Sequence, residues 1–233
     1  MAIEYVNGAV NFDAASYSTI AAPATNHTAG NLIVVIGASY SGDETNIASI
    51  TDTAGNAYTR ITGAADASSD CIEIWYAKNI IGNANNIVTI NFKYAYSFRG
   101  IHVLQYSGCD TGAPLDTSAI GSGQSAVPVT ANITTTQADE VLVAGDVLFD
   151  PKTHTAGTGY TIRTIFGGSD PSFGSSEDRI VSSTGTYNAS YTLDSSISWA
   201  MVMATFKAAE APAGNWFLLQ ARNELQGIRG ING

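Results

Sequence analysis

Three histidines, His27, His102 and His154, are the side chains best suited to general acid–base chemistry near neutral pH. His102 alternates with apolar residues in a predicted strand, which is typical of a satisfied core histidine, and the other two lie in polar segments expected at the surface. The sequence has no Gly-x-Ser-x-Gly nucleophile motif, no glycine-rich phosphate loop and no His-Glu-x-x-His zinc motif. We therefore expect no catalytic residue, no cofactor and no enzyme activity.

Acidic residues offer a second kind of chemistry, either the paired carboxylates of a glycoside hydrolase or a calcium site. Most of them lie in Gly-, Ser- and Asn-rich segments, where Asp is first of all a turn-forming residue, and Glu73 alone lies well inside a predicted strand. Asp43–Glu44 and Glu177–Asp178 could supply oxygen ligands from loops, but neither pair has the spacing of an established calcium motif. We expect solvated turn residues and no metal site.

The two cysteines, Cys71 and Cys109, do not lie in a metal-binding spacing. Cys71 opens one predicted strand, and Cys109 follows the end of another strand two strands later. In a simple meander these points lie at opposite ends of the sheet, about 20 Å apart, whereas a disulfide requires Cα atoms within roughly 7 Å. We expect two reduced, partly buried thiols.

Aromatic residues carry the remaining chemical signal. Tyr94 and Tyr96 lie in or beside a predicted loop at residues 94–98. An exposed row of aromatic rings is how carbohydrate-binding sandwiches stack on sugar rings, although strand aromatics are equally often core. We assign Trp75 and Trp199 to the core and keep Tyr94 and Tyr96 as the candidate ligand-contacting residues.

The composition favours a β-rich protein that either functions outside the cytoplasm or packs closely against copies of itself. Charged residues make up only 13% of the chain, about half the usual share of soluble domains, and small polar residues replace them. The net charge of −10, with singly scattered basic residues, argues against nucleic acid and an anionic membrane as partners. No apolar run reaches the ~18 residues of a membrane span, and no signal peptide is expected at the start.

Short apolar runs separated by Gly, Asn, Asp and Ser predict strands from residue 30 to about residue 207. The series repeats after about one hundred residues: residues 140–145 resemble 31–37, and residues 198–206 resemble 99–107. Two such five-strand halves cannot each hide a hydrophobic face alone, so we expect them to pack together.

The predicted fold class is all-β, an antiparallel β-sandwich of jelly-roll-like or immunoglobulin-like type, built from two similar five-strand halves. Residues 1–207 form a single domain, with N-terminal strands in 1–29 and halves at about 30–109 and 139–207. The predicted core contains Val34, Ile36, Trp75, Ile90, Val103, Val143, Trp199 and Val202.

Residues 208–233 differ in character, with an Ala/Pro/Gly linker followed by an apolar run and a short helical pattern. Such a run left in water would be an unusual exposed patch, so we expect this tail to dock on its own sandwich or, preferably, on a neighbouring subunit. The candidate assembly residues are Trp216, Phe217, Leu218, Leu219, Leu225 and Ile228.

Four runs, at residues 31–35, 50–58, 74–79 and 104–108, resemble a β-sandwich surface module that occurs in phage virion appendage and decoration proteins and in bacterial extracellular proteins. The resemblance covers residues 30–207 and consists of turn and core signatures, which speak for the fold more than for an activity.

The resemblance implies a non-enzymatic virion structural protein, a capsid decoration or tail/fibre component. Its expected partners are copies of itself and other virion proteins, and its expected location is the virion. The alternative is a carbohydrate- or surface-binding adhesion module of a bacterial extracellular protein, located outside the cell or on its surface, with a host-surface glycan as ligand. A glycan-active enzyme is a third, more distant interpretation.

Overall fold

The computed structural model describes residues 2–169 and 172–210. Within them the regular secondary structure consists of strands and one short 3-10 helix, η1 (Phe166–Gly168). No helix in this part of the chain is long and apolar enough to cross a membrane. The six candidate assembly residues lie outside the described residues, so the docking tail stays a prediction: Trp216, Phe217, Leu218, Leu219, Leu225 and Ile228.

Strands of the first half pair antiparallel with one another. In chain order they are β1 (Glu4–Asp13), β2 (Tyr17–Ala21), β3 (Thr25–His27), β4 (Leu32–Tyr40), β5 (Ile47–Asp52), β6 (Thr59–Ala65), β7 (Asp70–Ala77), β8 (Asn83–Asn86) and β9 (Val88–Ser107).

Strands of the second half are also antiparallel, and several are very short. They are β10 (Leu115–Ser125), β11 (Ile133–Thr134), β12 (Glu140–Leu148), β13 (His154–Thr155), β14 (Thr161–Ile165), β15 (Ser175–Val181), β16 (Thr186–Tyr187), β17 (Thr192–Leu193) and β18 (Ile197–Lys207).

Two five-stranded arrays with the same strand order form the centre of the molecule. The first sheet runs β1-β9-β4-β7-β6 and the second sheet runs β10-β18-β12-β15-β14. Each pair of equivalent strands occupies the same place in its sheet, so the predicted antiparallel sandwich of two similar five-strand halves is confirmed. The boundary expected at residue 207 stays a prediction, although β18 ends at Lys207.

The membership of the two arrays differs from the prediction at one strand. Residues 86–91 were expected to be one of the five repeated strands of the first half, but residues 88–91 lie at the start of β9, which pairs there with β2 and β5 outside the first sheet. The fifth strand of each array is instead an edge strand, β1 or β10.

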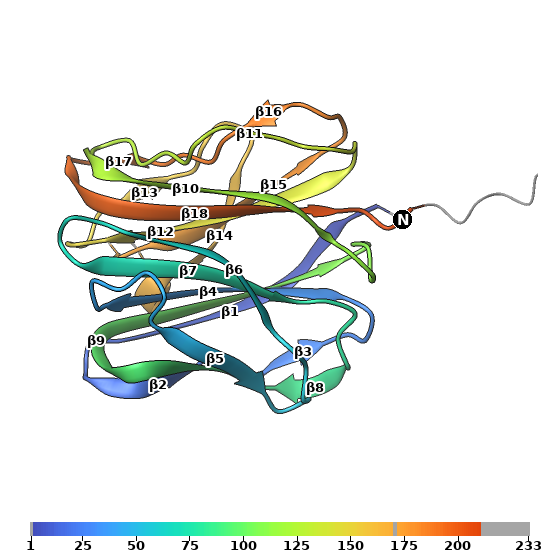
Figure 1. The fold of residues 1–233 in the computed structure, drawn as a ribbon, viewed down its shortest axis with the longest axis horizontal. Helices are drawn as coiled ribbons and strands as arrows, with labels where there is room; N and C mark the ends of the chain where they lie inside the picture. The colour runs from blue at the N-terminus through green and yellow to red at the C-terminus, as the bar shows by residue number, and fades with distance from the viewer. Residues whose placement is uncertain (1, 170–171, 211–233) are drawn as a thin grey trace, which may run out of the picture.

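The elements stack in layers, as Figure 1 shows from top to bottom. The apolar faces of the first and second sheets pack against each other, and we call this shared interface the seam; Val34, Ile36, Val143 and Val202 are fully buried in it. A second cluster lies between the first sheet and the β2–β9–β5 strands. A third lies between the second sheet and the short pairs β11–β16 and β13–β17.

Strand β9 belongs to two layers because it bends in the middle. Its first part pairs with β2 and β5, and its second part pairs with β1 and β4. The register shifts by one residue where Ala38 faces Gly100 but Tyr40 faces Ser97, which is a β-bulge at Phe98–Arg99. Bulges of this kind let one strand turn the corner between two packed sheets.

All eight side chains predicted for the core are buried, with Trp75 the most accessible at 9%. Cys71 and Cys109 are both buried, and neither takes part in a disulfide. Burial raises the pKa of both thiols, so they remain protonated at neutral pH.

Replacing Trp199 by alanine should lower the free energy of unfolding by about 3–5 kcal/mol. The indole is 5% exposed, and its Nε1 donates a hydrogen bond of 3.0 Å to Ser125 Oγ, so the change leaves a large cavity and removes this hydrogen bond. Urea unfolding measures the loss. Ile120→Ala, on the same sheet but 42% exposed, is the control and should cost under about 1 kcal/mol. An equally small loss for Trp199→Ala would contradict its place in the core.

Candidate functional site

A cleft opens at one end of the seam, with a cavity of about 330 Å³ between the two halves. The residues that line it from the first half are Tyr40, Asp70, Ser97 and Phe98. Those that line it from the second half are Phe149, Asp150 and Phe173. Because small-molecule sites prefer such junctions between packed units, this seam cleft is the candidate functional site.

Strand alternation explains why these side chains meet. On β4, Val34, Ile36 and Ala38 point into the seam, and Tyr40 is the next residue of that series. On β7, Ile72 and Ile74 face the seam, and Asp70 continues their row toward the cleft. On the opposite sheet, Phe149 continues the row of Val143 and Val147 just beyond the end of β12. The cleft is therefore the outermost layer of the seam, built from aromatic and acidic residues instead of aliphatic ones.

Pairing across the first sheet places three lining residues side by side. Tyr40 is the register partner of Asp70 on β7 and of Ser97 on β9. These three positions form a row across neighbouring strands, which holds the phenol, the carboxyl and the hydroxyl at fixed spacing.

Phe98 occupies the bulge of β9 in a strained backbone conformation, with a φ of 51°. A positive φ is unfavourable for a bulky residue and is often retained where it positions a functional side chain. The Phe98 ring centroid lies 5.6 Å from that of Phe173 and 6.4 Å from that of Phe12. These contacts fix the ring at the cleft while leaving it 43% exposed.

Three aromatic rings of the cleft are open to solvent. Tyr40 is 44% exposed, Phe98 43% and Phe149 48%. Exposed apolar rings that gather around a cavity mark an interaction site more strongly than singly scattered ones.

A carboxyl group without a counter-ion lies among these rings. Asp70 is only 6% exposed, and its buried Oδ2 has no hydrogen-bond partner. Burial, with the nearby charges of Asp66 and Asp150, raises the pKa of Asp70 to about 7. Asp66 sits directly behind it and accepts a hydrogen bond of 2.9 Å from the Asp70 backbone N–H.

The predicted ligand-contacting tyrosines lie on the same strand as Phe98 but outside the residues that line the cavity. Tyr94 is 70% exposed, and its ring makes an edge-on contact with Tyr96, with centroids 6.3 Å apart. Tyr96 packs on Phe92 and the core of the first half. A role of this tyrosine pair in ligand binding therefore stays a prediction, separate from the cleft.

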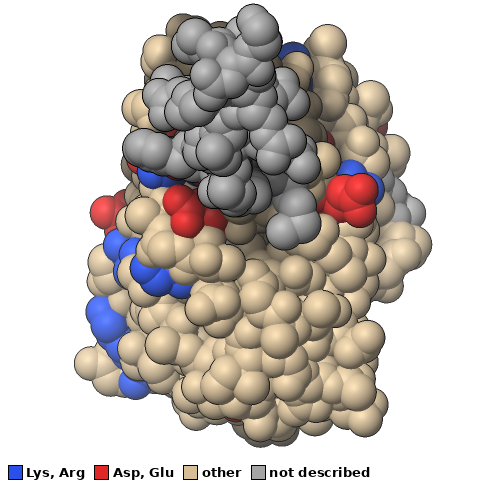
Figure 2. Space-filling model, turned by 90° about the vertical axis from the view of Figure 1, so that its right-hand side faces the viewer, with Lys and Arg blue, Asp and Glu red and all other residues tan. Residues whose placement is uncertain are grey.

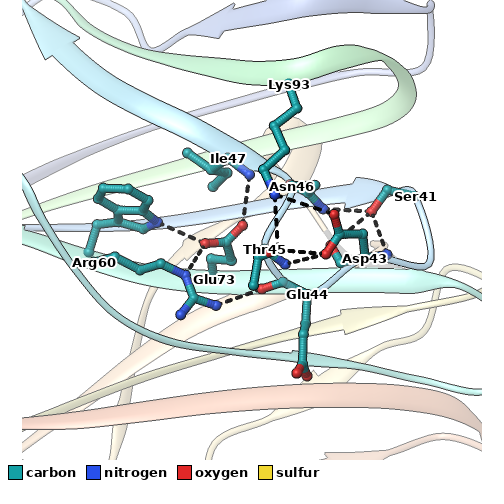
Figure 3. A network of polar contacts seen from close by, with 10 residues as sticks. Ser41, Asp43, Glu44, Thr45, Asn46, Ile47, Arg60, Glu73 and Lys93 are labelled. Atoms are coloured by element: carbon teal, nitrogen blue, oxygen red, sulfur yellow. Dashed lines mark hydrogen bonds and ion pairs between the residues drawn. The ribbon is translucent and has the colours of Figure 1, made fainter.

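Glu73, the acid expected inside a strand, has a structural environment (Figure 3). Its carboxylate accepts hydrogen bonds from the Ile47 backbone N–H at 2.8 Å, from Arg60 Nε at 2.6 Å and from Trp75 Nε1 at 3.2 Å. Arg60 also donates to the Glu44 carbonyl, so the pair holds the loop before β5 on the first sheet. Both carboxylate oxygens are occupied, which leaves none for a substrate.

His27 and His154 were expected at the surface, and this prediction is wrong because both are buried. His154 Nε2 lies 3.1 Å from Asp146 Oδ2 in a pair with no exposed side-chain surface. His27 Nδ1 lies 2.8 Å from Asn86 Nδ2. Buried hydrogen-bond partners elsewhere in the chain, Asn86 and Asp146, satisfy these rings, so the polar neighbours of the two histidines in the sequence did not indicate exposure.

His102 is buried in the seam, as expected for a core histidine. Its Nδ1 lies 2.7 Å from Thr164 Oγ1, and its ring stacks on Phe166 with centroids 4.0 Å apart. Burial, together with the charge of His154, lowers the pKa of His102 to about 3, so the ring is neutral at physiological pH.

Glu177 and Asp178 were expected in a turn, but they lie buried inside β15 on opposite faces of the sheet. Glu177 accepts a hydrogen bond of 3.0 Å from the Gly157 backbone N–H, on the outer face. Asp178 accepts one of 2.8 Å from Tyr106 Oη across the seam. Two residues on opposite faces cannot chelate one cation, and no group of three His, Cys, Asp or Glu side chains within residues 2–169 and 172–210 could hold a metal.

Stability should decrease as the pH rises from about 5 to about 8. Burial raises the pKa of Asp70 to about 7 and that of Glu177 to about 8, above their values in the unfolded chain. The folded protein thus retains protons that the unfolded chain has already released, and this stabilisation is lost as the pH passes through the folded-state pKa values. Calorimetric melting temperatures test the trend. Glu177→Gln should flatten it and exposed Glu4→Gln should not, whereas a melting temperature that rises over this range would contradict it.

No protein-family model and no curated protein matches the chain. The seam cleft and its place in the sandwich are the structural features from which a function can be inferred.

Proposed function

We propose that this protein is a non-enzymatic virion structural protein, a capsid decoration or tail/fibre component. In this role one end of the sandwich docks on copies of the chain and on other virion proteins, and the opposite end displays the seam cleft. The observation that carries the proposal is that the described chain ends and the cleft lie at opposite ends of the same strands.

The geometry of β4 gives the separation of the two ends. Tyr40 closes β4 at the cleft, whereas Leu32 opens it beside Tyr106, near the point where the chain enters and leaves the sandwich. There Ala208 bridges to Cys109, close to the first described residues. At about 3.3 Å per residue, the nine residues of β4 place the two ends roughly 27 Å apart. In Figure 1 the N-terminus lies at the right and the bend of β9 at the left.

The end that carries the chain termini suits close contact with another protein. A hollow of about 460 Å³ lies there, lined by Ala2, Ile3, Ile180 and Ala209 among others, and Ile180 is 47% exposed. Figure 2 looks onto this end and shows a wide uncharged surface in its lower central and right-hand part, with charged side chains along its left edge and beside the grey atoms. Few charges need to be desolvated when such a surface is buried, which favours subunit contact.

A carbohydrate- or surface-binding adhesion module outside the cell is the second candidate. The exposed rings of Tyr40, Phe98 and Phe149 favour it, because sugar rings stack on such faces. In both candidates the cleft is the ligand-binding end. They differ in the protein to which the opposite end is attached.

Removing residues 211–233 should leave the sandwich folded but reduce its oligomer size. The described residues 2–169 and 172–210 supply three buried apolar clusters of their own, so circular dichroism and the melting temperature should stay nearly unchanged. Light scattering coupled to size-exclusion chromatography measures the oligomer. The full-length Phe149→Ala variant, changed only at the cleft end, is the matched control and should assemble normally. If the truncated chain unfolds, the tail belongs to the core; if it assembles normally, the docking role is wrong.

The purified protein should not hydrolyse glycosides, esters or peptides. Among the described lining residues, the carboxyls are those of Asp70 and Asp150, and the uncharged polar groups are Ser97 and the Tyr40 phenol. These polar groups are too few to orient a sugar for attack. Chromogenic substrates assayed between pH 5 and pH 8 test this expectation. Hydrolysis that disappears in Asp70→Asn would make the protein an enzyme and overturn the proposal.

A further inference from the structure

We propose that the seam cleft binds an organic ammonium group, carried either by a lysine side chain or by a quaternary ammonium headgroup. The inference deepens the proposed function, since it names the ligand class of the end that the protein displays. Three features carry it: the aromatic walls, the unpaired carboxyl between them and the absence of a basic residue from the described lining.

The walls of the cleft present aromatic faces from both halves. Tyr40 and Phe98 come from the first sheet, and Phe149 follows β12 of the second. An ammonium group between aromatic faces is attracted by their negative quadrupole, and this attraction strengthens where water is excluded. The strained backbone of Phe98 and its contact with Phe173 hold one wall in place before any ligand arrives.

The floor of the cleft is negative and uncompensated. Asp70 has one buried oxygen without a partner, Asp66 lies behind it and Asp150 faces the same cavity from the other half. Arg99, the nearest cation along β9, is turned away: it donates to Asp13 and to the Ala15 carbonyl. None of the described lining residues is basic, so the carboxyls repel one another until a cation enters.

The same features separate an ammonium ligand from a neutral sugar. A sugar hydroxyl could donate to Asp70 but would leave the repulsion among the three carboxyls in place. Sugar sites also need several polar groups to orient the ring, and here Ser97 and the Tyr40 phenol are the uncharged ones. A cavity of about 330 Å³ is at the small end of ligand sites, which fits a compact cationic group.

Calorimetric titration of the full-length protein tests the proposal with a matched pair of probes. Choline and 3,3-dimethylbutan-1-ol (dimethylbutanol below) have the same shape, but in dimethylbutanol an uncharged carbon atom replaces the charged nitrogen. Choline should bind saturably and at least about tenfold more tightly than dimethylbutanol. It should also bind more tightly at pH 8.5 than at pH 5.5, because Asp70, with a pKa of about 7, is ionised at the higher pH. Nα-acetyl-lysine N-methylamide, which carries a lysine ammonium group, is titrated in the same way. The cation that binds more tightly shows whether the ligand is a quaternary ammonium headgroup or a lysine side chain.

Two variants locate the site. Asp70→Asn should weaken choline binding at least about tenfold without lowering the melting temperature at pH 8.5, because it removes a buried charge that destabilises the fold. Asp139→Asn is the control: it removes the same charge at the opposite end, at a φ of 56° that asparagine tolerates, and should bind choline as the wild type does.

The proposal is overturned if choline and dimethylbutanol bind equally, if neither cation binds, or if Asp70→Asn binds choline as well as the wild type. Binding of glucose, galactose or N-acetylglucosamine with no response to choline would assign the cleft to sugars. These outcomes leave the assembly test with residues 211–233 removed unaffected, so the ligand class and the structural role can fail separately.

Discussion

Neither five-stranded sheet can hide its apolar face alone, and the burial of the two faces against each other is the constraint on which the molecule depends. Each aliphatic side chain buried in the seam, such as Val34 or Ile36, stabilises the fold by about 1.5–3 kcal/mol. The strands continue their alternation to the end of the seam, where the apolar rows end in Tyr40, Asp70 and Phe149. The cleft thus lies where the packed core ends, and aromatic and acidic side chains take the place of aliphatic ones there.

Apolar packing alone would let two sheets of equal strand order slide past each other, and hydrogen bonds across the seam prevent this. Tyr106 on the first sheet donates to Asp178 on the second at 2.8 Å, and His102 lies 2.7 Å from Thr164. A shift of register would separate the buried Tyr106 hydroxyl and the His102 ring from these partners, which is costly in the interior. The same ties determine which residues of the two halves face each other across the cleft.

The continuous apolar runs of β4 and β12 predicted the centre of both sheets, because a strand buried on both faces needs few other signals. β10 has no such run: its Gly- and Ser-rich sequence joins the second sheet through backbone hydrogen bonds to β18, and sequence reasoning missed it. Phe98 and Phe149 are far apart in the chain, and only the packing of the halves brings them to one cavity, so no local spacing could predict the site. The alternation along β4 that ends in Tyr40 was the sequence signal that could have indicated a residue of the cleft. Buried acids were missed for a related reason, because their partners come from distant strands.

The strands that join the two ends of the sandwich give it a mechanical property. If the cleft holds a ligand and the opposite end is fixed, tension acts along β4, β9, β12 and β18, which run between the two ends. The hydrogen bonds between antiparallel strands are perpendicular to that direction, so many of them resist the pull together as a shear instead of opening one after another. Under a pulling force on the ligand, the contacts between the ligand and the cleft would therefore break before the sandwich unfolded.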